Sequence, residues 1–414
     1  MIPLSKLEEV VVDQLKNFKD RDLGMARDID FNKYKKTKQI TVVSGVRRSG
    51  KSTLLRQFAE KFNNEFYYLN FDDERLVDFS LEDFEVLMTA FQKMYPSKTI
   101  FLDEIQNIER WERFARRLYE ENYKIFITGS NAKLLSSKLT THLTGRYFKI
   151  ELYPFSFKEF LSFKKVDWKK KGTDIRVKIL KNFEEYLKKG GFPEYVKYRD
   201  SEFVKRIYED VIYKDILTRF NIREVKSFRE LAGFLFSNFT REISYNSLKN
   251  ILGFKSAASV KNYIGFLESS FLIFELYKYD YSLKKQFVSN KKVYVIDNGM
   301  KNAVAFSFSE DRGKMLENAA FLELKRRGRE IYYFKGKREC DFVVKEKNKI
   351  TLSIQVTNNL NKGNQKRELN GLLEAMKEFK LKKSLILTGD QEYTIKKDGY
   401  VIEVAPLWKW MLED

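Results

Sequence analysis

A glycine-rich loop near the amino end of the chain has the residue types and the spacing of a phosphate-binding site. Residues 45–52 read GVRRSGKS and fit the pattern G-x-x-x-x-G-K-[ST] at every fixed position. Glycines let the backbone N–H groups of such a loop turn toward phosphate, and the first turn of the following helix adds positive potential. Lys51 then reaches the β- and γ-phosphate oxygens, and the Ser52 hydroxyl binds Mg²⁺. We therefore expect ATP and Mg²⁺ as cofactors, and the residues predicted to bind them are Gly45, Arg47, Arg48, Ser49, Gly50, Lys51, Ser52 and Thr53.

Two adjacent acidic residues, Asp103 and Glu104, close the apolar run 99–103. A carboxylate at the end of a neighbouring strand can hold the Mg²⁺ shell, directly or through water, and a second can polarise the attacking water as a general base. We assign the first role to Asp103, beside Ser52, and the second to Glu104. The alternative is an acidic strand end that faces solvent. With Lys51 as a further catalytic residue, the pair predicts hydrolysis of ATP as well as binding.

Three more polar residues follow or precede apolar runs and are candidates for the same chemistry. Ser130 or Asn131, after the run 124–128, could orient water against the γ-phosphate, or could cap the next helix, and the two roles can coexist. Arg146, before the run 147–152, is either an arginine finger or a surface residue. As a finger it would act in its own subunit or in a neighbouring one, and the second case implies a homo-oligomer.

Alternating strands and helices must bring these residues together. Such alternation predicts a parallel sheet covered by helices on both faces, with the nucleotide at the carboxyl ends of the strands. Before the first strand, Arg27 either lines the adenine pocket or lies in a loop that covers the sheet edge. The predicted strands are 40–44, 66–71, 99–103, 124–128 and 147–152, and the predicted helices are 51–62, 81–94, 111–121 and 131–138.

Five segments carry a more specific likeness. They read, in order, GVRRSGKSTLL, YYLNFDDERL, IFLDEIQNIERW, FITGSNAKLL and LTGRYFKIELYPFSFKEFL, and GGFPE at 190–194 and Asp215-Ile216 follow. The chain resembles the AAA-type P-loop ATPases of archaea and bacteria that carry a C-terminal domain of unassigned function. The likeness covers nearly the whole chain. It implies an AAA-like ATPase core with Lys51, Ser52, Asp103 and Glu104 in the roles given above.

The middle of the chain contains two segments with different patterns of apolar residues. Residues 155–224 are helical in pattern, and we interpret them as a lid over the nucleotide. Residues 225–288 resemble a winged helix-turn-helix, with a β pair at 273–277 and 285–288 as the wing. The alternative to DNA contact by this module is protein contact. The third helix would offer to a major groove Lys255, Ser256, Ser259, Lys261 and Asn262.

The C-terminal third shows an αβββαβ order that looks like the restriction-endonuclease-like fold. The resemblance implies that Glu317, Asp341 and Gln355 hold Mg²⁺ and activate water. The lysine expected two positions after Gln355 is absent, because residue 357 is Thr. Lys362 or Lys366 is a candidate replacement, and the alternative is a nuclease frame kept only for binding. The elements are expected at 312–327, 330–334, 340–345, 350–356, 365–379 and 383–387.

Composition limits the chemistry. With one Cys and one His, the chain can build neither a Cys/His zinc site nor an intrachain disulfide. Its 78 Lys and Arg residues outnumber 58 Asp and Glu residues, and the net charge of +20 favours a polyanionic partner such as double-stranded DNA. The single thiol indicates a reducing, cytoplasmic setting, and no stretch approaches the roughly 18 apolar residues that span a membrane.

The sequence therefore predicts an α/β protein with a P-loop parallel sheet and a helical lid, followed by a winged helix and a restriction-endonuclease-like α/β domain. We place the ATPase core at 1–154, the lid at 155–224, the winged helix at 225–288 and the last domain at 289–414. The predicted function is that of an ATP-hydrolysing switch or motor associated with DNA. The alternatives are a nucleotide-dependent DNA nuclease and a nucleotide-gated scaffold that binds a protein partner and hydrolyses slowly.

Overall fold

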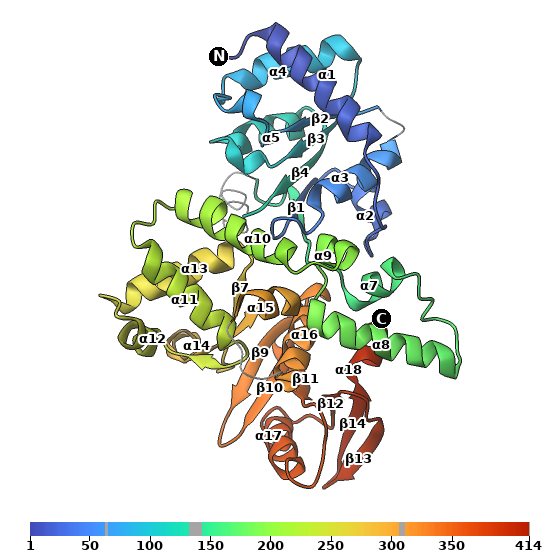
Figure 1. Ribbon diagram of the computed structural model, residues 1–414, viewed down its shortest axis with the longest axis vertical. Coiled ribbons are helices and arrows are strands. Elements are labelled where there is room, and N and C mark those ends of the chain that lie inside the picture. Colours follow the sequence, from blue (N-terminus) through green and yellow to red (C-terminus); the bar gives the residue numbers. More distant parts are fainter. Residues whose placement is uncertain (63–64, 132–142, 306–310, 414) are drawn as a thin grey trace. The chain divides into compact units, whose positions relative to one another are not determined.

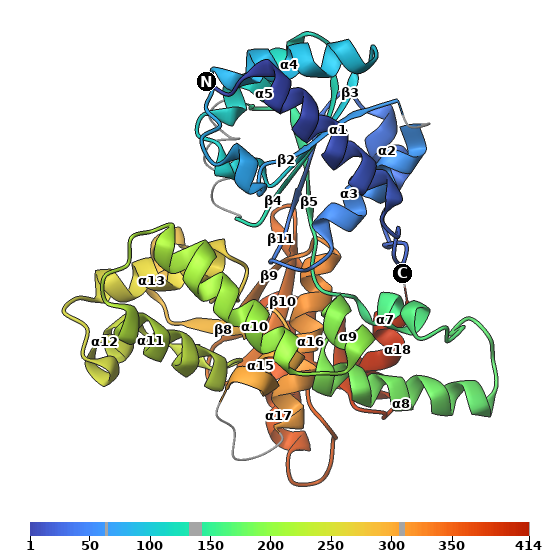
Figure 2. The same cartoon turned by 45° about the horizontal axis from the view of Figure 1, so that its top comes forward.

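The computed structural model describes residues 1–62, 65–131, 143–305 and 311–413. The chain divides into two compact units, one of Met1–Tyr153 with Ser269–Phe271 and one of Pro154–Glu268 with Leu272–Asp414. Figures 1 and 2 label the elements of both units. The predicted helix at 131–138 lies outside the described residues from residue 132 onward, as does His142.

The first unit is built on a five-stranded sheet in which all strands are parallel. In spatial order the strands are β2 (Tyr67–Asn70), β3 (Thr99–Asp103), β4 (Lys124–Gly129), β1 (Ile40–Ser44) and β5 (Tyr147–Glu151). The parallel sheet confirms the predicted α/β fold class. The sequence places Asp103 on a neighbour of the loop strand β1, and this detail is wrong, because β4 lies between β1 and β3.

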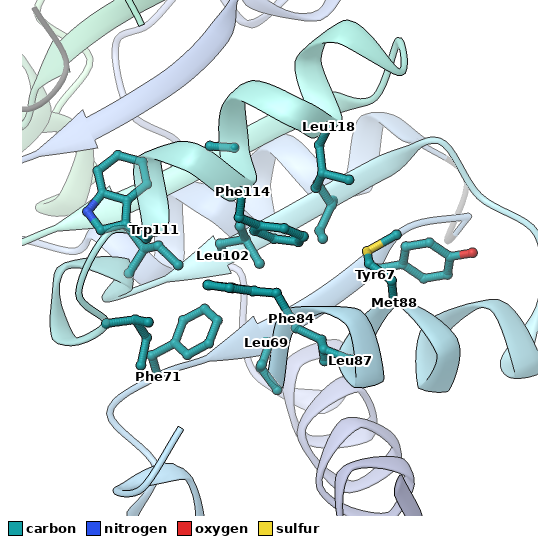
Figure 3. Packing of buried hydrophobic residues seen from close by; sticks show 14 of the residues in the cluster. Tyr67, Leu69, Phe71, Phe84, Leu87, Met88, Leu102, Trp111, Phe114 and Leu118 are labelled. Carbon is teal, nitrogen blue, oxygen red and sulfur yellow. The ribbon is translucent and has the colours of Figure 1, made fainter. Parts of the chain in front are cut away.

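Helices cover both faces of this sheet, as the fully buried β1 requires. Alternate strand residues point to opposite faces, so Val42 and Leu102 join a cluster with α4 and α5, while Val43 joins a cluster with α3. Figure 3 shows the first cluster, in which the aromatic ring of Phe84 stacks on that of Phe114. The helices are α1 (Leu4–Asp20), α2 (Phe31–Lys36), α3 (Lys51–Ala59), α4 (Asp83–Met94) and α5 (Trp111–Glu120), with 3₁₀ turns at Glu60–Phe62, Glu74–Leu76 and Ile105–Asn107.

The second unit begins with a group of helices. Within this unit α8 packs against α15 and α16, α10 packs against α15, and α7 packs against α18. The role of these helices as a lid over the nucleotide stays a prediction. The helices are α7 (Phe157–Phe163), α8 (Thr173–Lys189), α9 (Pro193–Tyr198), α10 (Glu202–Asp210), a π-helix (Val211–Thr218), α15 (Asn298–Val304), α16 (Arg312–Arg326) and α18 (Leu407–Leu412).

The Gly-Gly pair after α8 is explained by one buried carboxylate. Asp297 caps α15 by accepting from the Met300 N–H at 2.9 Å, and it also accepts from the Gly191 N–H at 2.7 Å. A Cβ on Gly190, whose φ is +70°, would lie 2.0 Å from an Asp297 carboxylate oxygen, so only glycine fits there. Burial raises the pKa of Asp297 to about 6. Gly190 and Gly191 are therefore explained by their close packing against Asp297.

Residues 225–295 form a small module of helices and strands. The elements are α11 (Val225–Ser237), β6 (Glu242–Ile243), α12 (Tyr245–Leu252), α13 (Ala257–Ser269), β7 (Ile273–Tyr277), α14 (Leu283–Val288) and β8 (Lys291–Val295), and the antiparallel sheet order is β6-β8-β7. The strand predicted at 285–288 is wrong, because this segment belongs to α14 and the strand that pairs with β7 is β8. Asp280 starts the turn by accepting from the Ser282 N–H at 2.9 Å, a local bond that favours a helical turn over a strand.

The C-terminal part is a six-stranded mixed sheet. Its spatial order is β13-β14-β12-β11-β10-β9, with parallel pairs β11/β12 and β12/β14. The αβββαβ elements lie where the sequence places them, and β13, β14 and α18 extend the sheet beyond that prediction. The elements are β9 (Glu330–Lys335), β10 (Glu339–Glu346), β11 (Lys349–Val356), α17 (Gln365–Glu378), β12 (Lys383–Thr388), β13 (Tyr393–Lys397) and β14 (Tyr400–Pro406).

Candidate functional site

The glycine-rich loop joins β1 to α3 at the carboxyl end of β1, where a parallel sheet binds ligands. Two of its glycines are sterically required. A Cβ on Gly45 would lie 2.2 Å from the Leu152 carbonyl oxygen. Gly50 precedes α3 with a φ of +99°, a conformation that L side chains rarely adopt. The loop backbone is therefore fixed in a shape that only these glycines permit.

Arg27 holds this loop in place. Its guanidinium donates from Nη1 to the Ser49 carbonyl at 3.1 Å and from Nη2 to the Tyr153 carbonyl at 2.7 Å. The side chain is buried, so these charge-assisted bonds anchor the loop to the segment after β5. Both alternatives that the sequence leaves open for Arg27, the adenine pocket and a loop over the sheet edge, stay predictions.

Lys51 is buried but only loosely paired. Its Nζ lies 3.4 Å from the Val46 carbonyl and 3.4 Å from Glu104 Oε1. An ammonium group has three donors, and both contacts lie at the outer limit of hydrogen-bond length. The Ser49 hydroxyl is buried and has no hydrogen-bond partner within the described part of the chain. A loop with spare donors of this kind fits an anionic ligand.

The two predicted Mg²⁺ ligands lie together. The nearby Ser52 hydroxyl favours the ionised form of the Asp103 carboxylate and so acts to lower its pKa. Asp103 accepts hydrogen bonds from the Thr128 hydroxyl on β4 and from the Tyr68 hydroxyl at 3.3 Å. Burial and the neighbouring Glu104 raise the pKa of Asp103. Hydroxyl and carboxylate oxygens are the ligands that Mg²⁺ prefers, so this pair fits the ion.

Glu104 occupies a strained position beside the loop. It has a φ of +52°, unusual for a residue with a side chain. Its Oε2 accepts from the Gln106 amide at 2.5 Å, and the same amide lies 3.4 Å from the Ser130 hydroxyl. Burial raises the pKa of the Glu104 carboxyl, but Lys51 and Gln106 outweigh burial and leave the pKa below its ordinary value. Gln106 is a site residue that the sequence reasoning missed, although it follows the acidic pair by two positions.

The remaining predicted residues of this site surround the loop or lie just beyond β4. Ser130 and Asn131 follow β4 and are buried, so the structure brings Ser130 to Glu104 through Gln106. Arg48 is exposed with a φ of +64°, while Arg47 and Thr53 are half-buried.

Arg146 lies at the other end of the sheet. It directly precedes β5, where Tyr147 pairs with Ile40 in parallel, and its carbonyl accepts from the Ile40 N–H at 2.8 Å. Gly45 follows further along β1, about 16 Å away at about 3.3 Å per residue. The guanidinium instead lies 3.1 Å from Glu120. Arg146 therefore does not reach the loop of its own chain, and a role in a neighbouring subunit stays a prediction.

The predicted nuclease-like residues also come together, around a lysine that the sequence reasoning missed. Lys292 of β8 lies between Glu317 and Asp341, at 3.0 Å and 3.1 Å. The Gln355 amide oxygen accepts from the Asp341 N–H at 3.3 Å. The alternation of residues along β8 puts Lys292 on one face with Tyr294, and this is the only sequence signal that pointed to it. The two candidate replacement lysines, Lys362 and Lys366, are exposed instead.

Three family models match successive parts of the chain. Residues 37–161 match an AAA domain, residues 180–311 match a domain of unknown function (DUF8612), and residues 312–410 match a second domain of unknown function (DUF4143). The boundary between the last two models falls between Lys292 and Glu317.

Relatives match the chain over nearly its whole length. An uncharacterized protein of Methanocaldococcus jannaschii is 37% identical, over 98% of this chain and 95% of that protein. An uncharacterized protein of Haemophilus influenzae is 32% identical, over 92% of this chain and 96% of that protein. The chain belongs to the AAA-domain P-loop ATPase family with a C-terminal domain of unassigned function. The resemblance stated from the sequence is confirmed.

Solved structures share parts of the fold at low identity. The Walker-type ATPase PABY2304 of Pyrococcus abyssi matches 69% of this chain and 99% of its own, with 16% identity and a TM-score of 0.44. The RuvB Holliday junction branch migration motor of Thermotoga maritima matches 65% of this chain and 93% of its own, with 16% identity and a TM-score of 0.29. Among the described residues, no helix is long and apolar enough to cross a membrane.

Proposed function

We propose that this protein is a Mg²⁺-dependent ATPase of AAA type, a switch or motor that binds and hydrolyses ATP at the loop 45–52. One observation carries the proposal. Lys51, Ser52, Asp103 and Glu104, which come from two separate strand ends, meet at one edge of the sheet beside a glycine-constrained loop. A mere acidic strand end would not need to meet a buried lysine there.

Each residue has a distinct part in this function. Lys51 and the loop N–H groups bind the phosphates, and Ser52 and Asp103 hold Mg²⁺, which when bound offsets negative charge on the phosphate oxygens. Glu104 accepts a proton from the attacking water, and its depressed pKa keeps it ionised for that role. Gln106 positions the Glu104 carboxylate and links it to Ser130.

Two substitutions test binding and hydrolysis separately. Lys51→Ala is expected to abolish ATP binding, measured by the fluorescence of a labelled nucleotide. Glu104→Gln is expected to keep binding and to lower the hydrolysis rate by about 10²- to 10⁴-fold. Lys36→Ala, at an exposed lysine of α2, is the matched control and should change neither. Nucleotide binding that survives in Lys51→Ala, or full hydrolysis in Glu104→Gln, would overturn the assignment.

We further propose that the ATPase is associated with double-stranded DNA through a winged helix at 225–288. The succession α11, β6, α12, α13, β7, α14 and β8 supports this, with β8, directly after the proposed range, between the other two strands of the sheet. Lys255, Lys261 and Asn262 are exposed on or just before α13. Ser256 and Ser259 are half-buried, and the Ser256 hydroxyl accepts from the Ser259 N–H at 3.1 Å, so Ser256 also caps this helix.

The DNA proposal is tested by the ATPase rate with and without double-stranded DNA and by the salt dependence of DNA affinity. Each phosphate neutralised adds about 0.9 to the slope of log affinity against log salt. Lys261→Glu should weaken binding and lower that slope, while Lys226→Glu, an exposed lysine on α11, should change both less. An affinity without salt dependence would contradict the proposal and favour a protein partner.

A further inference from the structure

A buried lysine lies at the centre of the nuclease-like residues. The Lys292 side chain is 4% exposed, and its Nζ lies 2.7 Å from Glu339 Oε1, 3.0 Å from Glu317 Oε1 and 3.1 Å from Asp341 Oδ1. An ammonium group has three N–H donors. Lys292 donates hydrogen bonds to Glu317 and Asp341 and forms an ion pair with Glu339, so three carboxylates surround the ammonium group.

The side chains predicted to hold Mg²⁺ are engaged with other protein groups as well. Glu317 Oε1 also accepts from the Tyr294 hydroxyl at 2.7 Å, and Asp341 Oδ2 accepts from the Val356 N–H at 2.9 Å. The Gln355 amide oxygen accepts from the Asp341 N–H at 3.3 Å, and the amide nitrogen donates to Glu368 Oε2 at 2.8 Å. Mg²⁺ needs such oxygens at about 2.1 Å, so it would have to displace Lys292 and these bonds.

We propose that the Lys292 ammonium stands in the place of the divalent cation, so that the nuclease-like site is neutralised from within and does not bind Mg²⁺. Lys292 does not restore the lysine that position 357 lacks. A lysine acting beside a metal would leave Glu317 and Asp341 free to bind that metal, whereas here its own Nζ contacts both, together with Glu339.

The origin of Lys292 gives the arrangement a second consequence. Lys292 lies in the region 180–311, while the three carboxylates lie in the region 312–410, so two family domains contribute to one ion cluster. A second cross-connection, between Lys335 of β9 and Glu242 of β6, joins the same two regions. The cluster is then a structural junction between β8, α16 and β10, and DNA cleavage by this domain is not expected.

Binding of Mn²⁺ to the full-length chain without nucleotide tests the proposal, with free Mn²⁺ measured by electron paramagnetic resonance. Lys292→Met keeps most of the apolar stem and removes the charge, so it should bind one more Mn²⁺ per chain than the wild type. The double variant Lys292→Met/Asp341→Asn should lose that extra ion. Lys335→Met is the matched control, because it removes a nearby positive charge but leaves Lys292, and it should bind as the wild type does.

Each outcome either supports or overturns the proposal. A folded Lys292→Met that gains no Mn²⁺ overturns the proposal, with folding checked by circular dichroism and by nucleotide binding. If Lys292→Met does not fold, the wild type is compared with Asp341→Asn. Equal Mn²⁺ binding supports an internally neutralised site, and a loss in Asp341→Asn overturns it. Cleavage of plasmid DNA by the wild type with Mn²⁺, absent in Asp341→Asn, would also overturn it and make Lys292 part of an active nuclease.

Discussion

Lys51 in the first unit and Lys292 in the second are equally buried, each with 4% of its side chain exposed. Their partners differ. Lys51 has one carbonyl and one carboxylate, both at 3.4 Å, while Lys292 has three carboxylates at 2.7–3.1 Å. A buried charge with incomplete pairing is costly unless a ligand completes it. The comparison teaches that completeness of pairing, and not burial, separates a site that awaits a ligand from one that needs none.

The two sites also differ in backbone conformation. Beside Lys51, Arg48 and Glu104 have positive φ although both carry side chains, and strain of this kind persists where the surrounding structure and function require it. None of Lys292, Glu317, Glu339 and Asp341 has a positive φ. The Lys292 cluster sits on regular helix and strand and stores no strain of this kind.

The largest effect that this comparison predicts is on stability. Lys292→Ala leaves three carboxylates without their cation, and breaking a buried ion cluster costs about 3–5 kcal/mol of the free energy of unfolding. Lys51→Ala removes a loosely paired charge and should cost less than about 1 kcal/mol. Urea unfolding of the full chain, followed by circular dichroism, measures both. Equal costs in the two variants would remove the distinction between the sites.

Lys335→Ala is a control that separates the effect of net charge from the effect of the central position of Lys292. Lys335 is half-exposed, at 46%, and also contacts Glu339, at 3.9 Å. Because solvent screens such pairs, Lys335→Ala should cost only about 0–1 kcal/mol. A cost near that of Lys292→Ala would mean that the net charge around β10 matters and the central position of Lys292 does not.

An intermediate effect is expected from the loop backbone. In Gly45→Ala the new Cβ would lie 2.2 Å from the Leu152 carbonyl, so the loop must shift, at about 1–3 kcal/mol, and ATP binding should be lost. Gly233→Ala is the matched change in α11, where a Cβ meets no atom within 4 Å. It should stabilise the chain by about 0.5–1 kcal/mol, because alanine favours a helix. Thermal unfolding and nucleotide binding report both, and ATP binding retained by Gly45→Ala would contradict the account of the loop.

The parts of the molecule that the sequence predicted are those with local patterns. The loop 45–52 and the pair Asp103 and Glu104 are contiguous, and the apolar runs beside them reveal the strands. The αβββαβ order is visible for the same reason, because each element carries its own periodicity. The exception is α14, where a local hydrogen bond from the Ser282 N–H to the Asp280 carboxylate favours a helical turn within a short segment.

The contacts that the sequence reasoning missed join residues far apart in the sequence. Arg27 reaches the carbonyl of Tyr153, and Lys292 reaches carboxylates on α16 and β10. No local pattern marks such partners, because the fold alone brings them together. The sequence reasoning looked for a lysine near Thr357 and did not find Lys292 for this reason, since Lys292 comes from the preceding domain. Arg146 shows the converse, because its place before a strand already puts it at the amino end of the parallel sheet, away from the carboxyl ends that bind ligands.

The smallest predicted effect concerns Glu275, a partly buried acid that faces a like charge. Burial and the neighbouring Glu268 raise the pKa of Glu275 to about 7, against the opposing effects of the Tyr245 hydroxyl, Lys291 and Lys261. Because the folded pKa lies above the unfolded value of 4.5, the folded state binds more protons between these values. Stability should therefore fall as the pH rises from 4.5 to 7.

Glu275→Gln should reduce the loss of stability over that pH range, measured by urea unfolding, by about 1 kcal/mol. Converting the whole pKa shift at about 1.4 kcal/mol per pKa unit would give a larger value, but Glu275 is half-exposed and solvent screens its charge. Asp297, whose pKa is raised to about 6, acts in the same direction, so the slope shrinks and does not vanish. Glu268→Gln removes the like charge and should flatten the profile less than Glu275→Gln does. An unchanged slope in Glu275→Gln would show that partial burial beside the like charge of Glu268 costs this fold nothing, against the contrast drawn between Lys51 and Lys292.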